Sequence, residues 1–229
     1  MPNWCNNSLM IEGAKEDLLE FELYAKGKCV GWKPSKDYPE PANTQRETRD
    51  LDFAQFVRPT EEDLSKTYHE YGYDWCIENW GTKWNACYIE VIDDYEDGCL
   101  TYVFNTAWSP ISQKLLDAMT GAFRKLKFTY KFDEGGCCFV GHNEDDGIIR
   151  AWTLPDKEEL IKQVVPIYEE HRPISESDGR EYSEDDMICD IYCDIIDDFN
   201  TGYCYVENDN FVWRVRPDKE PVILKEGSF

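Results

Sequence analysis

The chain has 229 residues, of which 41% are hydrophobic and 14% are aromatic, so its composition is that of a folded protein and not of a disordered one. Its 24 Lys and Arg residues are outnumbered by 47 Asp and Glu residues, which gives a formal net charge of −23 at pH 7. Free duplex DNA and anionic membranes bind basic surfaces, so this charge disfavours them as partners and favours basic proteins or cations.

The ten cysteines are scattered without the regular spacing of a disulfide framework. The sequence has no secretory signal pattern, and no apolar run approaches the roughly 18 residues that a membrane span requires. We therefore expect a cytoplasmic protein with reduced thiols and no membrane segment.

The periodicity of apolar residues predicts strands and helices in an ordered succession through the first part of the chain. A strand, a helix, a second helix within a long insertion, two strands, a third helix and a strand are expected in turn at residues 4–11, 14–26, 60–78, 86–92, 100–104, 109–126 and 128–132.

Local signals support the boundaries of three of these elements. Thr60 precedes three acidic residues and is the expected N-cap of the second helix. The dipeptide Asp97-Gly98 lies between two β-rich runs and is typical of a hairpin turn. Ser109 is the expected N-cap of the third helix, with Pro110 at its first helical position. The two runs are therefore predicted to pair antiparallel.

This order of elements is the split βαβ arrangement of a ferredoxin-like sandwich, an α+β fold. We predict such a domain at residues 1–153, with the insertion at about 28–80 and a further hairpin formed by residues 137–141 and 148–152. The name describes a topology and implies no iron–sulfur cluster, because the cysteines lack the closely spaced run that a cluster requires.

The rest of the chain, residues 154–229, is predicted to be a smaller acidic region with two helices and a terminal β-hairpin. The helices are expected at 157–171 and 184–199. Residues 1–150 hold 16 basic and 27 acidic side chains, a net charge of −11, and residues 151–229 hold 8 and 20, a net charge of −12. The shorter part is therefore the more densely charged.

The second of these helices carries a row of aspartates. Asp186, Asp190, Asp194 and Asp198 follow one another at i, i+4 spacing, and Asp197 adjoins them. Each like-charged pair at this spacing costs roughly 0.2 to 0.5 kcal/mol, so a mixed surface would be more stable. Three interpretations remain open: a solvated helix face, a line of negative charge that imitates a nucleic-acid backbone and binds a basic partner, or a metal-binding site.

Tryptophans and asparagines gather in the middle of the sequence. The possible members of a ligand pocket are Asn79, Trp80, Lys83, Trp84, Asn85, Asn105 and Trp108, with Trp4 close to them in the predicted fold. Indole rings of this kind lie more often in a core, because each offers a large apolar area. The alternative is a pocket in which rings stack on a nucleotide or a short single strand and the polar side chains anchor it.

Four ordered motifs resemble the YubB-like ferredoxin-fold proteins of phages and plasmids. They are PNWCNNSLMIEG, NWGTKWNA, FNTAWSP and EGGCCFVGH, at residues 2–13, 79–86, 104–110 and 134–142. The resemblance covers most of residues 1–150. It implies a ferredoxin-like domain and an origin in a mobile element, and it implies no particular activity.

Catalysis has little support in the sequence. His69, His142 and His171 have no evident nucleophile context, no glycine-rich phosphate loop is present, and no cofactor or metal site is expected. The leading hypothesis is a non-enzymatic acidic protein that binds and inhibits a basic, nucleic-acid-handling host defence factor, of the restriction or CRISPR kind. The alternatives are a nucleotide- or single-strand-binding module and a metal-dependent hydrolase that uses the clustered acids.

Overall fold

The computed structural model describes most of the first two thirds of the chain and three strands beyond it. The described residues are 3–28, 31–36, 48–135, 139–143 and 145–153, together with the backbone of 204–207, 210–213 and 222–226. The chain divides into two compact units, one made of Met1–Glu134 with His142–Ile149 and the other of Gly135–Gly141 with Arg150–Phe229.

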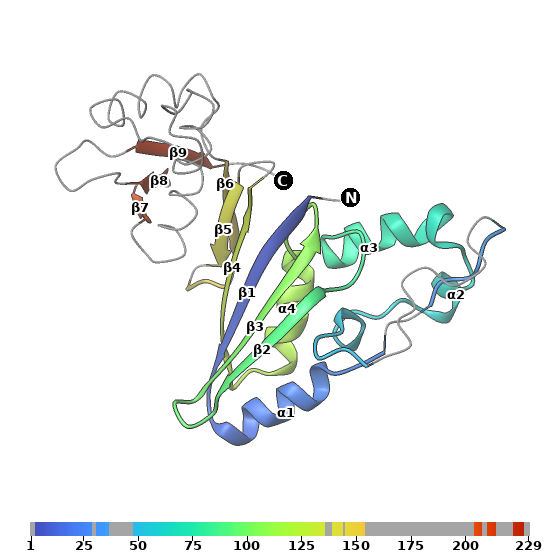
Figure 1. Ribbon diagram of the computed structural model, residues 1–229, viewed down its shortest axis with the longest axis horizontal. Helices are drawn as coiled ribbons and strands as arrows, with labels where there is room; N and C mark the ends of the chain where they lie inside the picture. Colours follow the sequence, from blue (N-terminus) through green and yellow to red (C-terminus); the bar gives the residue numbers. More distant parts are fainter. Residues whose placement is uncertain are drawn as a thin grey trace, which may run out of the picture. The chain divides into compact units, whose positions relative to one another are not determined.

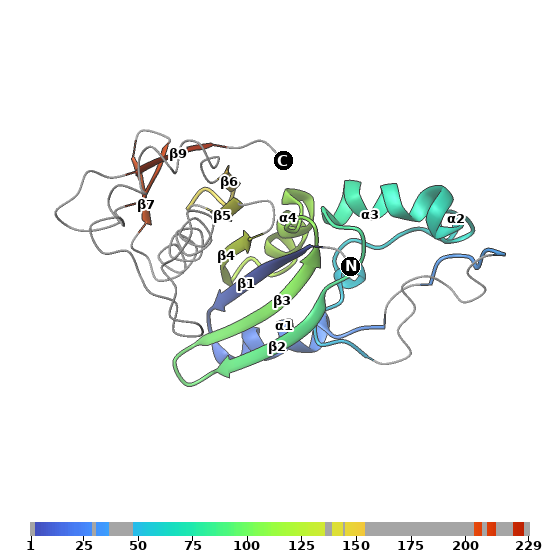
Figure 2. The same ribbon diagram turned by 45° about the horizontal axis from the view of Figure 1, so that its top comes forward.

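The first unit is built on four antiparallel strands in the order β2-β3-β1-β4, with two helices on one face of the sheet (Figures 1 and 2). Its elements in chain order are β1 (Trp4–Glu12), α1 (Lys15–Ala25), β2 (Cys87–Asp94), β3 (Cys99–Ala107), α4 (Gln113–Ala122) and β4 (Lys127–Glu134). This is the split βαβ order, so the predicted ferredoxin-like α+β fold is confirmed.

Residues of β1 alternate between the core and the open face of the sheet, as a strand covered on one side requires. Leu9 and Ile11 are fully buried, whereas the residues between and beyond them are half-buried. On the covered face, Phe21 of α1 lies 5.9 Å from the ring of Tyr102 and 5.6 Å from that of Phe128, centroid to centroid. The aromatic core therefore joins α1 to both neighbours of β1.

The helix expected at residues 60–78 is three shorter segments. They are α2 (Glu61–Leu64), a π-helix (Tyr68–Gly72) and α3 (Tyr73–Trp80). Thr60 is the N-cap, as predicted, and exchanges hydrogen bonds with Asp63 in a capping box. Gly72 lies against the buried ring of Trp32, where a Cβ atom would come within 2.6 Å of the indole. The close approach of Trp32 explains why position 72 is a glycine.

The predicted start of the third helix is wrong. Ser112, and not Ser109, is the N-cap of α4, and its hydroxyl accepts a hydrogen bond from the Leu115 amide at 3.2 Å. Ser109 instead donates through its hydroxyl to the carbonyl of Gly81 at 2.8 Å. This contact joins segments 28 residues apart, which local helix signals do not encode.

The second unit contains strands β7 (Cys204–Glu207), β8 (Asn210–Trp213) and β9 (Val222–Glu226), which pair antiparallel in that order. Strands β5 (Phe139–Asn143) and β6 (Ile149–Thr153) form the hairpin predicted after β4, and β6 pairs antiparallel with β9. The terminal hairpin of the prediction is thus a three-stranded set. The helices predicted at 157–171 and 184–199 lie outside the described residues.

Among the described residues, no helix has both the length and the apolar character needed to cross a membrane.

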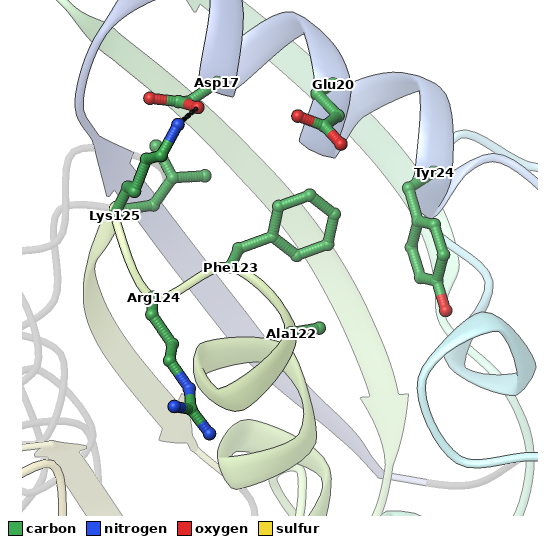
Figure 3. A pocket seen from close by; sticks show the side chains of 8 residues that line it. Asp17, Glu20, Tyr24, Ala122, Phe123, Arg124 and Lys125 are labelled. Atoms are coloured by element: carbon green, nitrogen blue, oxygen red, sulfur yellow. Dashed lines mark hydrogen bonds and ion pairs between the residues drawn. The ribbon is translucent and has the colours of Figure 1, made fainter.

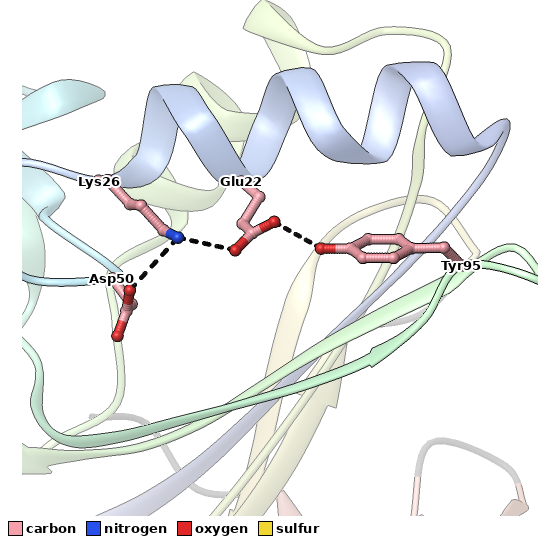
Figure 4. A network of polar contacts seen from close by, with 4 residues as sticks. All are labelled: Glu22, Lys26, Asp50 and Tyr95. Atoms are coloured by element: carbon pink, nitrogen blue, oxygen red, sulfur yellow. Dashed lines mark hydrogen bonds and ion pairs between the residues drawn. The ribbon is translucent and has the colours of Figure 1, made fainter.

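A polar network connects the β2–β3 hairpin to α1 (Figure 4). The hairpin turns at Gly98, which has a φ of 72°, as its sequence predicts. Next to the turn, the hydroxyl of Tyr95 donates to Glu22 of α1 at 2.5 Å, and Lys26 donates to the same carboxylate at 2.8 Å. Asp50 lies 3.6 Å from the Lys26 ammonium. The hydrogen bonds from Lys26 and then from Tyr95 hold the pKa of Glu22 below its ordinary value of 4.5.

Replacing Tyr95 by Phe should lower the free energy of unfolding by about 1 kcal/mol at neutral pH, since the lost bond has a charged acceptor but is only partly buried. Because the pKa of Glu22 is lowered in the folded protein, the carboxylate stabilises the fold above pH 4.5 and loses this effect as the pH falls through the folded pKa. The difference between Tyr95→Phe and wild type should therefore narrow below pH 4.5, measured by denaturant unfolding.

Tyr24→Phe provides the matched control. The hydroxyl of Tyr24 donates to the neutral carbonyl of Gln55 at 2.8 Å. Loss of this hydrogen bond should therefore lower the free energy of unfolding by the same amount at neutral pH and in the acidic range. A difference for Tyr95→Phe that stays constant through the acidic range would contradict the role assigned to Glu22.

Candidate functional site

Two of the seven predicted pocket residues lie in the core at the end of α3. Trp80 is 1% exposed, and its indole Nε1 donates to the carbonyl of Val57 at 2.8 Å. Asn79 is 7% exposed, donates to the carbonyl of Trp75 at 2.8 Å and accepts from the ammonium of Lys114 at 2.5 Å. Both side chains have their hydrogen bonds within the fold, so a ligand at the surface does not reach them.

Asn85 is also buried, and its amide joins the insertion to the residue before β2. Its Nδ2 donates to Asp52 at 2.6 Å, and its Oδ1 accepts from the backbone amides of Phe53 at 3.0 Å and Ala86 at 2.9 Å. Because buried amide groups need partners, this side chain fixes the path of two chain segments at once. It positions the neighbouring residues instead of meeting a ligand itself.

Lys83 and Trp108 do lie at the surface and in contact. The Lys83 ammonium is 4.9 Å from the centroid of the Trp108 ring and 5.7 Å from that of Tyr73, at cation–π distance from both. The side chains of Trp108 and Tyr73 are 40% and 38% exposed. Three segments supply this group: α3, the turn after α3, and the residue that follows β3.

A second aromatic group adjoins the first. Trp4, the first residue of β1, lies 6.4 Å from Trp84 and 5.3 Å from Tyr88, centroid to centroid and edge to face. The Trp108 amide donates to the carbonyl of Asn3 at 3.0 Å, which places Trp108 beside the start of β1. Together the two groups form what we call the aromatic surface, made of Trp4, Tyr73, Lys83, Trp84, Tyr88 and Trp108.

Two members of the aromatic surface have an unusual backbone. Tyr88 has a φ of 50° and Trp108 a φ of 73°, and they are the only non-glycine residues with positive φ among those that the structure describes. Bulky side chains rarely adopt this left-handed conformation, which costs roughly 1 to 2 kcal/mol per residue. Tyr88 sits in a bulge of β2, between Cys87 and Glu90, and is 75% exposed. Such strain concentrates at functional sites.

Sequence reasoning missed Tyr73 and Tyr88. Tyr88 falls inside an ordinary strand pattern, and nothing in the local sequence indicates a bulge there. Tyr73 lies in a predicted helix, where an aromatic residue is usual. Only the fold brings both of them to the same end of the unit as Trp4.

Asn105 lies on the open face of the sheet. Its amide donates to Asn6 at 2.7 Å, and Asn6 donates to Asp133 at 2.8 Å, so a polar row crosses β3, β1 and β4. Asn105 is half-buried and opposite Cys87 in the pairing of β2 with β3. It therefore adjoins the aromatic surface at the bulge.

The thiols of Cys5 and Cys87 do not have the environment of nucleophiles. Cys5 is buried, and desolvation raises its pKa well above the ordinary value of 9.0, with a further rise from the charge of Asp133. Desolvation also raises the pKa of the half-buried Cys87. Reactive thiols have lowered pKa values, so both groups stay protonated at neutral pH. Within the described residues, no group of three or more His, Cys, Asp or Glu side chains is arranged to hold a metal ion.

The row of aspartates from Asp186 to Asp198 lies outside the described residues, so its interpretation stays a prediction.

Comparison with known proteins identifies a ferredoxin-like domain. Residues 79–171 match a family model described as the ferredoxin-like domain in Api92-like protein. Among solved structures, the crystal structure of a protein Api92 from Yersinia pseudotuberculosis is similar, with 11% sequence identity and a TM-score of 0.47. The match covers 64% of this chain and 95% of that chain. No curated protein matches the chain.

Asn85→Ala should lower the free energy of unfolding by about 3 kcal/mol, because it leaves two buried backbone amides without their acceptor and removes one of the donors to Asp52. Asn105→Ala, the matched control on the half-buried open face, should cost under about 1 kcal/mol. Denaturant unfolding measures both. Equal costs would contradict the structural role of Asn85.

At position 88, glycine should be more stable than alanine by about 1 kcal/mol. Both Tyr88→Gly and Tyr88→Ala remove the ring, but only glycine adopts a φ of 50° without strain. In an ordinary strand the order is reversed, with alanine more stable by roughly 0.5 to 1 kcal/mol. Denaturant unfolding of the two variants compares them directly, and the ordinary order would show that the left-handed bulge is absent in solution.

Proposed function

We propose that this protein is a non-enzymatic acidic binding protein of a phage or plasmid, which binds and inhibits a basic, nucleic-acid-handling defence factor in the cytoplasm of its host. The observation that carries the proposal is the aromatic surface, in which Tyr88 and Trp108 are exposed although each has a left-handed backbone. A conformation that costs stability and presents a ring to solvent is explained if the ring is a contact for a partner.

The composition of the aromatic surface favours a protein partner. Tyr and Trp are enriched among the residues that contribute most to protein–protein affinity, because they bury a large area with few rotatable bonds. The edge-to-face contacts of Trp4 with Trp84 and Tyr88 hold these rings in place before binding. Less conformational entropy is then lost when a partner arrives.

The charge of the chain favours a basic partner. A net charge of −23 repels free nucleic acid and attracts the basic proteins that handle it. Asp186, Asp190, Asp194, Asp197 and Asp198 provide the second contact in this proposal, as a line of charge that imitates phosphates. The contribution of these aspartates to affinity would then fall as the salt concentration rises, while that of the aromatic surface would depend on salt less.

The mobile-element origin rests on the four ordered motifs that resemble YubB-like proteins. Three of them supply the aromatic surface: the first contains Trp4, the second Lys83 and Trp84, and the third Trp108. Proteins of mobile elements often act on host defence, and this association favours a defence factor as the target class.

A second candidate is recognition of a nucleotide or a short single strand. The observation that favours it is the ammonium of Lys83 beside the Trp108 ring, 4.9 Å from its centroid, since a base could stack on the ring while the lysine meets a phosphate. Base stacking on an aromatic side chain contributes roughly 1 to 3 kcal/mol. The net charge opposes this candidate.

The experiment is affinity capture from a host lysate at low and moderate salt, with mass-spectrometric identification of the retained proteins. We expect wild type to retain a basic, nucleic-acid-handling complex and the double variant Tyr88→Ala, Trp108→Ala to lose it. Replacing Asp186, Asp190, Asp194 and Asp198 by Asn should weaken retention mainly at low salt, where these charges are least screened. Leu23→Ser, which changes another exposed apolar side chain, is the control and should bind like wild type.

Retention of no basic complex, or equal retention by all variants, would contradict the proposal. Titration with mononucleotides and short oligonucleotides tests the second candidate through tryptophan fluorescence. A saturable change that the double variant abolishes would favour that candidate instead.

A further inference from the structure

A pocket of about 270 Å³ lies between α1 and the C-terminal end of α4 (Figure 3). It is in the first unit but at the other end of β1 from the aromatic surface, beside Leu126, which precedes β4. Pockets that hold drug-sized ligands or cofactors are usually about 300 to 1,000 Å³, so this one is suited to a smaller group such as a single side chain.

Two aromatic rings form one wall of the pocket. The ring of Phe123 lies 5.4 Å from that of Tyr24, centroid to centroid, at an interplanar angle of 69°. Phe123 also packs edge to face against the buried ring of Phe21, and the hydroxyl of Tyr24 donates to the carbonyl of Gln55. Contacts on both sides therefore hold the wall in position, with Phe123 at its centre (Figure 3).

The charged groups of the pocket are unequally engaged. Lys125 forms an ion pair with Asp17 at 2.9 Å. Arg124 donates through Nε to the carbonyl of Gly121 at 3.3 Å and extends away from the Phe123 ring (Figure 3). Glu20 makes no hydrogen bond or ion pair with any described residue, and its carboxylate points toward the space beside the ring. The charge of Glu20 raises the pKa of Lys125, after the larger effect of Asp17, but the Glu20 carboxylate has no hydrogen bond to a described residue. The pocket thus presents a carboxylate with free acceptor capacity next to an aromatic face.

We propose that this pocket binds the guanidinium group of an arginine side chain. The planar guanidinium would stack on Phe123 and donate hydrogen bonds to the Glu20 carboxylate, two contacts that a compact ammonium cannot make together as well. Glu20 and Tyr24 are one helical turn apart on α1, so the carboxylate and the ring face the same space. The site goes beyond the proposed function and does not depend on the aromatic surface.

The test uses N-acetyl-arginine amide as the probe and two-dimensional NMR of the labelled full-length protein as the readout. We expect saturable shifts of residues around Phe123 and upfield shifts of the probe's side-chain protons, which stacking on a ring produces. Glu20→Gln should weaken binding of the probe about fivefold. This factor corresponds to ~1 kcal/mol, the upper end of the range for an exposed ion pair. The isosteric neutral probe, N-acetyl-citrulline amide, should bind as weakly to wild type as the arginine probe binds to Glu20→Gln.

Glu16→Gln is the matched control, because it removes the same charge from α1 at an exposed position outside the pocket. Free L-arginine distinguishes the source of the group: stronger binding of the capped probe indicates an arginine within a protein, and equal or stronger binding of the free amino acid indicates a small-molecule ligand.

The inference is overturned if Glu20→Gln binds the probe like Glu16→Gln, if citrulline binds as well as arginine, or if no shifts occur near Phe123. None of these results bears on the lysate capture, which tests the proposed function through Tyr88 and Trp108.

Discussion

The buried hydrogen bonds of Asn85 are the interaction on which the candidate site depends. Through Asp52 and the amide of Phe53, this side chain ties the middle of the insertion to the residue before β2. Lys83 and Trp84 immediately precede Asn85, and Tyr88 follows it by three residues, so its position sets where all three reach the surface. The buried polar side chain of Asn85 therefore allows its aromatic neighbours in the sequence, Trp84 and Tyr88, to be held at the surface.

Tyr88 and Trp108, exposed aromatic residues with a left-handed backbone, contribute less to the stability of the fold than other residues would at the same positions. Tyr88 buries a quarter of its surface, and its contact with Trp4 offsets only part of the cost of its φ. Trp108 combines a similar φ with contacts to Lys83 and to the start of β1. Stability alone would favour glycine or asparagine in these conformations, so the presence of aromatic residues is better explained by what they bind.

The order of strands and helices could be predicted because it depends on apolar periodicity, which each element carries in its own residues. The start of α4 could not, because Ser109 is held by Gly81, far away in the sequence. The sequence also could not predict which tryptophans are buried. Trp80 and Trp84 belong to one short motif, yet Trp80 is buried against Val57 and Trp84 lies beside Trp4. Contacts of long range decide which ring enters the core, and the bulge at Tyr88 has no local signal at all.

The distribution of ion pairs explains how the pocket at Glu20 can favour a cationic group although the first unit contains many basic residues. Lys15, Lys26, Lys125 and Lys127 each have an acidic partner within the unit, at 2.5 to 3.6 Å. A paired lysine contributes little to the field at a distance, whereas the acids in excess remain uncompensated. Glu20 is one such acid, and it is placed where an aromatic face adds to its attraction for a planar cation. The charge surplus therefore acts through particular positions and not only as a uniform coating of the surface.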